Sequence, residues 1–101
     1  MPAYIFGKLT VDHWDWYREY RSVTEPLVAR HGGRYLVKGG DSERLEGKEP
    51  LGHALVLIEF PDRQAAENWY RDPDYARMIA LRQGSGVATE LALIEGCAPP
   101  G

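Results

Sequence analysis

The chain has 101 residues, with 12 Lys and Arg against 15 Asp and Glu, which gives a formal net charge of −3. This length and an apolar content of 44% describe one globular domain and exclude two. The Lys and Arg residues are scattered rather than clustered, so we expect no nucleic-acid partner and no anionic membrane surface as partner.

The sequence also argues against membrane insertion and secretion. No window approaches the roughly 18–20 continuous apolar residues that a membrane span requires, and the N-terminus lacks the basic region and cleavage site of a signal peptide. The single Cys97 cannot form a disulfide within the chain, which agrees with a reducing compartment. We therefore expect a cytoplasmic protein.

The first third of the chain predicts a strand followed by a helix. Residues 3–11 are rich in aromatic and β-branched side chains, and Asp12 is a good helix cap. Apolar or helix-facing positions then recur every three or four residues, at Trp14, Tyr17, Tyr20, Thr24, Leu27, Val28 and His31. Pro26 removes a backbone donor inside this pattern, so we expect the helix to bend or restart near residues 24–26. Gly32 and Gly33 should end it.

Two strands separated by a long connection are predicted next. Residues 34–38 form a short strand that stops at Gly39 and Gly40, and the charged residues 41–50 form an exposed connection. Residues 53–60 are the clearest strand of the chain, and Pro61 closes it.

The remaining residues predict two helices and a final strand. Asp62 caps the first helix, Asp72 and Pro73 start a further one, and residues 84–86 terminate it before a strand over 87–96. The order β-α-β-β-α-β in about a hundred residues predicts an α+β, ferredoxin-like fold with a four-stranded antiparallel sheet and helices on one face. We expect residues 1–97 to form this domain and residues 98–101 a short C-terminal tail.

The strands are apolar on both faces, which has a consequence for assembly. In 53–60, Ala54, Val56, Ile58 and Phe60 share one face while Leu55 and Leu57 share the other, and Tyr4 and Phe6 likewise oppose Ile5, Leu9 and Val11. Helices cover one face only, so we expect a homodimer in which a second subunit covers the other.

Several chemistries find no support in the motifs. The 53–60 strand lacks the aromatic platform of an RNA-recognition motif. His13, His31, His53 and Cys97 have no metal-ligand spacing, and the glycine pairs lack the lysine of a phosphate loop. We therefore expect no metal and no cofactor.

A few polar residues in apolar surroundings are candidates for a site. His31, at the end of the first helix, is either a cap favoured by the helix dipole or a functional group. Glu59 lies in the most apolar strand and needs a cationic partner if it is buried, for which Arg34 and Arg82 are the candidates. An ion pair of this kind is either structural or catalytic.

Aromatic residues form a second group of candidates. Tyr17, Tyr20, Trp69, Tyr70 and Tyr75 fall on helix faces with the spacing of core residues, for which simple packing is the default interpretation. Their hydroxyl and indole groups seek hydrogen-bond partners when buried, so the same stripe could line an apolar ligand pocket with a few polar points.

The motifs together resemble one known family. They are the segments 31–37, 45–47, 58–61, 65–70 and 73–75, with Arg82 and the closing 94–96. In this order they are similar to the domain-of-unknown-function family numbered 1330 over nearly the whole chain. The resemblance implies a dimeric α+β barrel with a cleft between sheet and helices, approached by His31, Arg34, Glu59, Trp69, Tyr75 and Arg82. The wider architecture includes cofactor-independent monooxygenases, lactone isomerases, haem-handling enzymes and ligand-sensing regulatory domains.

Two functional hypotheses remain open. The first is a cofactor-independent enzyme, oxygenase- or isomerase-like, acting on a small apolar or aromatic carbonyl compound, with His31, Arg34 and Glu59 catalytic. Its substrate-binding residues would be Tyr17, Tyr20, Trp69, Tyr75 and Arg82. The alternative is a non-catalytic homodimer that binds a small-molecule ligand, a hydrophobic metabolite, or a partner chain. A haem protein with His31 as axial ligand is a more distant third.

Overall fold

The computed structural model describes residues 1–39 and 41–97. Gly40, from the expected Gly39–Gly40 turn, and the expected tail 98–101 lie outside the described residues. The elements follow the order β1 (Ala3–Thr10), α1 (Tyr17–Arg30), β2 (Arg34–Lys38), β3 (Ala54–Phe60), α2 (Arg63–Tyr70), α3 (Pro73–Gly84) and β4 (Ala88–Glu95).

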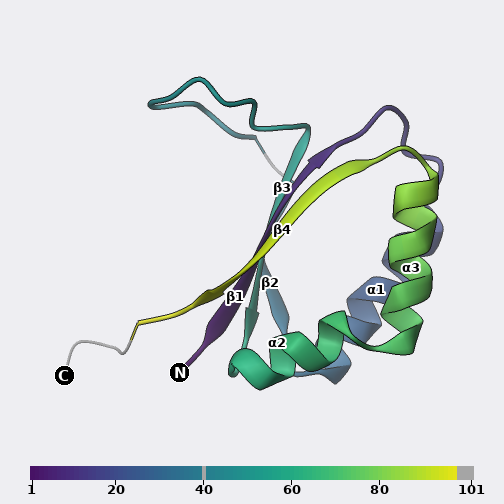
Figure 1. The fold of residues 1–101 in the computed structure, drawn as a ribbon, viewed down its shortest axis with the longest axis vertical. Helices are drawn as coiled ribbons and strands as arrows, with labels where there is room; N and C mark the ends of the chain where they lie inside the picture. The colour runs from purple at the N-terminus through teal and green to yellow at the C-terminus, as the bar shows by residue number, and fades with distance from the viewer. Residues whose placement is uncertain (40, 98–101) are drawn as a thin grey trace.

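The four strands form one antiparallel sheet in the order β2-β3-β1-β4. Ile5 on the central strand β1 pairs with Ile58 on β3 and with Leu93 on β4, so the three side chains lie on one face. In the part of the chain that the structure describes, helices α1, α2 and α3 all cover that face, and the other face carries no helix (Figure 1). The predicted α+β, ferredoxin-like arrangement is confirmed, with the second helical segment divided in two.

Aspartates set the starts of α2 and α3, as the sequence predicted. Asp62 accepts a hydrogen bond from the backbone N–H of Ala65 at 2.8 Å, and Asp72 accepts one from the N–H of Asp74 at 2.9 Å. Pro73 occupies the first turn of α3, where a missing N–H costs nothing.

Helix α1 differs from the prediction at two points. It begins at Tyr17, not after an Asp12 cap, and it runs through Pro26 to Arg30 without a break, so the expected restart was wrong. Pro26 provides no N–H for the carbonyl of Ser22, four residues earlier, but both residues are exposed. Water can bond the freed carbonyl on this outer side, and the buried Thr24, Leu27 and Val28 hold the inner side.

The core lies between the sheet and the helices. Phe60, Trp69 and Tyr75 are among its largest fully buried side chains. Gly33 allows the end of α1 to lie close to the sheet, because a Cβ there would come within 2.7 Å of the Phe60 ring and 2.9 Å of Val28.

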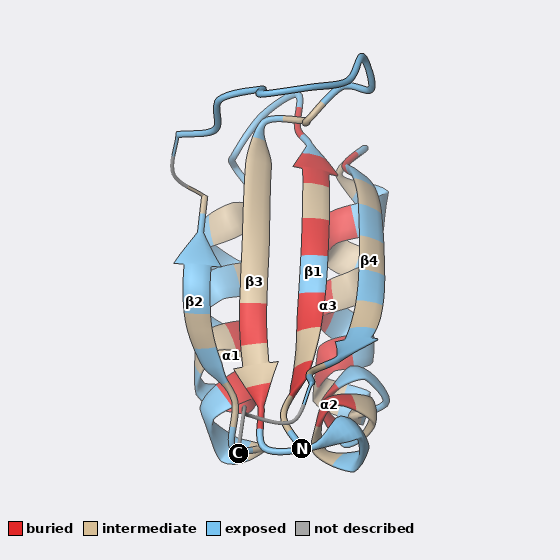
Figure 2. Ribbon diagram, turned by 90° about the vertical axis from the view of Figure 1, so that its left-hand side faces the viewer, coloured by how far each residue is buried: buried red, intermediate tan, exposed pale blue. Residues whose placement is uncertain are grey.

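The other face of the sheet is open (Figure 2). Its centre is apolar: Phe6 pairs with Leu57, and Phe6, Val37 and Ile94 are 39%, 42% and 49% exposed. Ion pairs lie on the same face, Lys8 with Glu90 at 3.0 Å and Arg34 with Glu59 at 2.9 Å. The connection 41–53, in its described residues, extends on this side, away from the helices (Figure 1).

Strand β2 contains a register shift that changes which side chains face the helices. Tyr35 pairs with Ile58 and Lys38 with Val56, while Val37 pairs with Leu57 on the open face. The extra residue, Leu36, forms an irregularity of the β-bulge type. Tyr35 and Lys38 therefore point to the helical side, although strict alternation would place them on opposite faces.

Among the described helices, none combines the length and apolarity needed to cross a bilayer.

Candidate functional site

A cavity of about 220 Å³ lies between the helix-covered face of the sheet and helices α1 and α3. Ile5, Leu9, Ala54, Val56 and Ile58 supply aliphatic side chains from the two central strands. The helices supply mainly aromatic ones. A concave apolar space with a few polar groups is the usual character of a small-molecule site.

Aromatic rings form the helical wall of the cavity. Trp16 and Tyr20 pack edge to face with ring centroids 5.2 Å apart, and Trp69 stacks on Tyr75 at 4.3 Å. The Trp16 indole donates to the carbonyl of His13 at 2.7 Å, which fixes that ring. These contacts give the wall a defined shape before any ligand binds.

Two tyrosines share a hydrogen bond within this wall. The hydroxyl oxygens of Tyr20 and Tyr75 are 2.8 Å apart. Burial, followed by the neighbouring Tyr20, raises the pKa of Tyr75, and burial likewise raises the pKa of Tyr35. Tyr75 and Tyr35 therefore stay neutral at physiological pH and bring no negative charge to the cavity.

Four polar atoms of the wall are buried without a hydrogen-bond partner among the described residues, and one of them, Glu25 Oε1, forms an ion pair with Lys38. The other three are Thr24 Oγ1, Trp69 Nε1 and Arg82 Nε. Arg82 is only 3% exposed, forms no ion pair with a described residue, and lies with its guanidinium 5.8 Å from the centre of the Tyr20 ring. Buried polar groups are nearly always satisfied in proteins, so three in one cavity wall are unusual.

The more exposed lining residues mark the mouth of the cavity. Lys38 on β2 forms an ion pair with Glu25 on α1, and Arg21 Nε donates to the same carboxylate at 3.2 Å. Partial burial, followed by the charge of Arg21, lowers the pKa of Lys38. Trp14, half exposed, completes the rim.

The structure brings together all five residues that the sequence suggested for substrate binding. Tyr17, Tyr20, Trp69, Tyr75 and Arg82 line this cavity. Tyr70, another member of the aromatic stripe, is 45% exposed at the end of α2 and lies outside the cavity.

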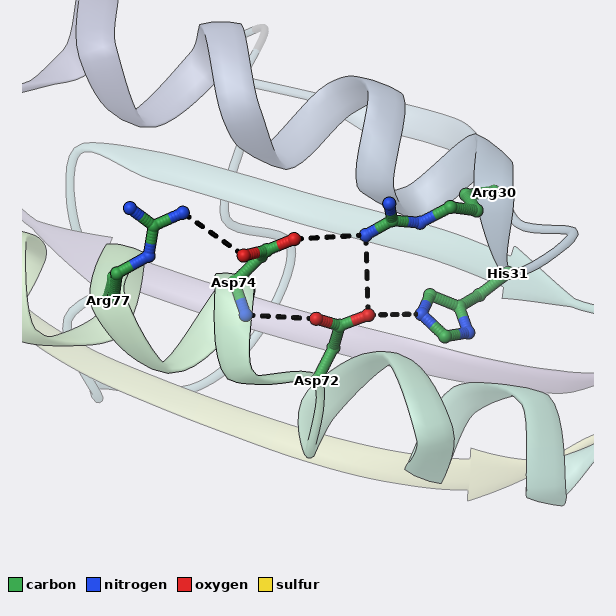
Figure 3. A network of polar contacts seen from close by, with 5 residues as sticks. All are labelled: Arg30, His31, Asp72, Asp74 and Arg77. Carbon is green, nitrogen blue, oxygen red and sulfur yellow. Dashed lines mark hydrogen bonds and ion pairs between the residues drawn. The ribbon is translucent and has the colours of Figure 1, made fainter.

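His31 lies at the joint between α1 and α3, outside the cavity lining (Figure 3). It follows α1 as the capping residue, and its Nε2 is 2.8 Å from Asp72 Oδ2, which also contacts Arg30 at 3.4 Å. The hydrogen bond with His31, then that from the N–H of Asp74, lowers the pKa of Asp72. These contacts make His31 a helix-joining residue.

Arg34 and Glu59 lie on the open face of the sheet, also outside the cavity lining. Arg34 Nε donates to Glu59 Oε1 at 2.9 Å, so Arg34 is the partner that Glu59 required, and Arg82 is not. The Tyr4 hydroxyl donates to Glu59 Oε2 at 3.2 Å, and this bond is the main reason that the pKa of Tyr4 is raised. The three candidate catalytic residues are thus separated from the five candidate binding residues.

The cavity also contains residues that the sequence analysis did not assign to a site. Thr24 was placed on the apolar helix face, and a polar residue at such a position was the available signal. Trp14 was expected on the same helix face, and Trp16 was not assigned to it. Lys38 gave no signal, because its orientation depends on the register shift in β2. Within the described residues, no three His, Cys, Asp or Glu side chains gather where they could hold a metal ion.

Comparison with known proteins identifies the family and the fold. Residues 2–97 match the family model described as domain of unknown function (DUF1330), so the chain belongs to this family. A comparison with curated proteins finds no match.

Solved structures with the same fold include two proteins. The chain is similar to RPA0582, a protein of unknown function from Rhodopseudomonas palustris, with a TM-score of 0.70 and 20% identity over 97% of this chain and 84% of that one. It is similar to the methylated form of RPA0582, with a TM-score of 0.70 and 22% identity over 99% and 84% of the two chains. Rv0793 from Mycobacterium tuberculosis matches with a TM-score of 0.54 and 15% identity over the full length of both chains.

Proposed function

We propose that this DUF1330 protein is a homodimer that binds a small apolar or aromatic metabolite in the cavity between its sheet and its helices. The observation that carries the proposal is the cavity of about 220 Å³ with its aromatic and aliphatic lining. An apolar cavity of about 150 Å³ accommodates benzene, so this one has room for a single substituted ring.

The geometry favours binding over catalysis. Glu25, the carboxylate in the lining, is held at the mouth by Lys38 and Arg21. The expected proton acceptors His31 and Glu59 are engaged elsewhere, with Asp72 and Arg34. A reaction on a carbonyl compound would need a base beside the bound molecule.

The open face of the sheet supports the homodimer. Exposed apolar side chains at its centre, with ion pairs on the same face, have the composition of a protein interface rather than of a monomer's surface. Two copies related by a two-fold axis would cover this face mutually and leave both cavities on the outer, helical side.

Ligand binding can be tested with benzyl alcohol as the probe and tryptophan fluorescence as the readout, because Trp16 and Trp69 line the cavity. We expect saturable quenching in the wild type and its loss in Val56→Phe, which fills the cavity. Leu55→Phe is the matched control, since the neighbouring residue points to the open face. Equal quenching in the two variants would contradict binding in this cavity.

A further inference from the structure

Arg82 carries a positive charge inside the cavity wall, and none of the described residues supplies a counter-charge. Only 3% of the residue is exposed, and within the same residues its Nε has no hydrogen-bond partner and no carboxylate pairs with it. An uncompensated buried charge is strongly unfavourable. Contact with the Tyr20 ring and its position in the last turn of α3 offset only part of this penalty.

Thr24 Oγ1 and Trp69 Nε1, the other two wall atoms without a partner among the described residues, can both donate a hydrogen bond, as Arg82 does. The Trp69 indole N–H can only donate, the guanidinium of Arg82 can only donate, and the Thr24 hydroxyl can donate. They come from α2, α3 and α1 and line one cavity. A ligand that satisfies such a set must bring acceptors, and a negative charge among them satisfies Arg82 as well.

We infer that the cavity is specific for a single-ring aromatic carboxylate, whose carboxylate is bound by Arg82 with Thr24 and Trp69 and whose ring packs against Tyr20 and the aliphatic floor of the sheet. The inference rests on the proposed function and names its ligand class. A planar carboxylate accepts two parallel hydrogen bonds from a guanidinium, which gives orientation as well as affinity.

The mouth of the cavity has a charge that fits an anionic ligand. Lys38 and Arg21 supply two positive charges against the single negative charge of Glu25. This local excess of positive charge favours the approach of an anion, although the chain as a whole is acidic.

The test compares benzoate and phenylacetate with neutral benzyl alcohol by isothermal titration calorimetry. In the wild type we expect the carboxylates to bind more tightly than the alcohol. Arg82→Met should weaken carboxylate binding by roughly ten- to a hundredfold, the range for a charge-assisted hydrogen bond, and change alcohol binding by less than about threefold. The control is Arg77→Met, which replaces an exposed arginine on the same helix and should leave the affinities for the carboxylates and for the alcohol unchanged.

A second variant, Thr24→Val, tests the proposal independently if Arg82→Met fails to fold. Thr24→Val is nearly isosteric and removes a hydroxyl that has no partner in the free protein, so its melting temperature should equal or exceed that of the wild type. Its affinity for benzoate should nevertheless fall by several-fold. This combination, unchanged stability with weaker carboxylate binding, is not expected of a structural residue.

The outcomes separate the two proposals. If benzyl alcohol binds and Val56→Phe abolishes its binding, but carboxylates gain nothing over the alcohol or keep their affinity in Arg82→Met, the carboxylate assignment is overturned and the cavity as a binding site stands. If none of the three probes binds at millimolar concentration, both proposals are overturned.

Discussion

The hydroxyl groups of Tyr20 and Tyr75, 2.8 Å apart, connect α1 to the first turn of α3 through the wall of the cavity. Each phenol is the partner that the other needs in an apolar environment. The same contact therefore holds two helices at a fixed distance. It also occupies both hydroxyl groups with each other, so they do not compete with other groups of the cavity for bonds to a ligand.

The two single hydroxyl removals should together destabilise the fold more than the double removal does. Tyr20→Phe and Tyr75→Phe each leave one hydroxyl without its partner, which costs about 1–3 kcal/mol of unfolding free energy for a buried group. The double variant leaves neither, so its destabilisation should be smaller than the sum of the single effects. Urea denaturation of the four proteins measures this difference, and strictly additive effects would contradict the coupling.

Alkaline pH should weaken the protein through the buried tyrosines. Because burial raises the pKa of Tyr75 above the ordinary value of 10.0, folding favours the neutral phenol. This stabilisation is fully present below pH 10 and is lost as the pH rises beyond it. We expect the melting temperature to fall from neutral pH to about pH 11, and to fall less in Tyr75→Phe. Equal slopes in the two proteins would argue against this origin.

Acid should weaken the joint between α1 and α3 (Figure 3). The hydrogen bond with His31 and the N–H of Asp74 lower the pKa of Asp72 below 3.8, so its stabilisation is present above that pH and is lost as the pH falls through the lowered pKa. Asp72→Asn keeps a capping oxygen but removes the charge. It should be less stable than the wild type at neutral pH, and the gap should close in acid.

A control for that prediction is Asp41→Asn, which removes a carboxylate from an exposed position of the long connection. It should show no stability gap at either pH. A gap between Asp72→Asn and the wild type that persists unchanged in acid would mean that the charge of Asp72 is not the cause.

Two glycines should respond oppositely to alanine. Gly33→Ala places a Cβ within 2.7 Å of the buried Phe60 ring and should destabilise by about 1–3 kcal/mol, as overpacking does. Gly84, within α3, has nothing within 4 Å of such a Cβ, so Gly84→Ala should stabilise by up to about 1 kcal/mol. Chemical denaturation compares them, and a stable Gly33→Ala would contradict the tight packing.

Charge on the open face should separate the proposed homodimer. Leu57→Glu places a carboxylate at the apolar centre of that face beside Phe6, and should shift the protein to monomers with the fold intact. Sedimentation and circular dichroism measure the two properties. Gln64→Glu, exposed on α2, is the control. A wild-type monomer at micromolar concentration would contradict the assembly.

The sequence predicted the elements well because local signals agreed with the packing. Asp62 and Asp72 predicted the starts of α2 and α3, and the alternation in 53–60 correctly separated Val56 and Ile58 from Leu55 and Leu57. The restart predicted near Pro26 was wrong because a proline's missing donor affects the outer side of α1, where water substitutes, while burial of the inner side holds the helix together.

The site was predicted only in part. The spacing of Tyr20, Trp69 and Tyr75 marks inward helix faces, and these do line the cavity. Which polar groups would find partners across the fold is a tertiary property. Glu59 pairs with Arg34 on the open face, whereas Arg82 forms no ion pair with a described residue. No spacing along the chain distinguishes these two arginines.

The register shift at Leu36 determines which β2 side chain lies at the cavity entrance. If β2 paired without the shift, with Leu36 opposite Leu57, strict alternation would place Val37 at the entrance and turn Lys38 to the open face. Deletion of Leu36 would instead remove the irregularity and leave Lys38 on the helical side. A pairing change of one residue in an edge strand would thus replace the cation at the entrance with an apolar side chain while the helices stayed in place.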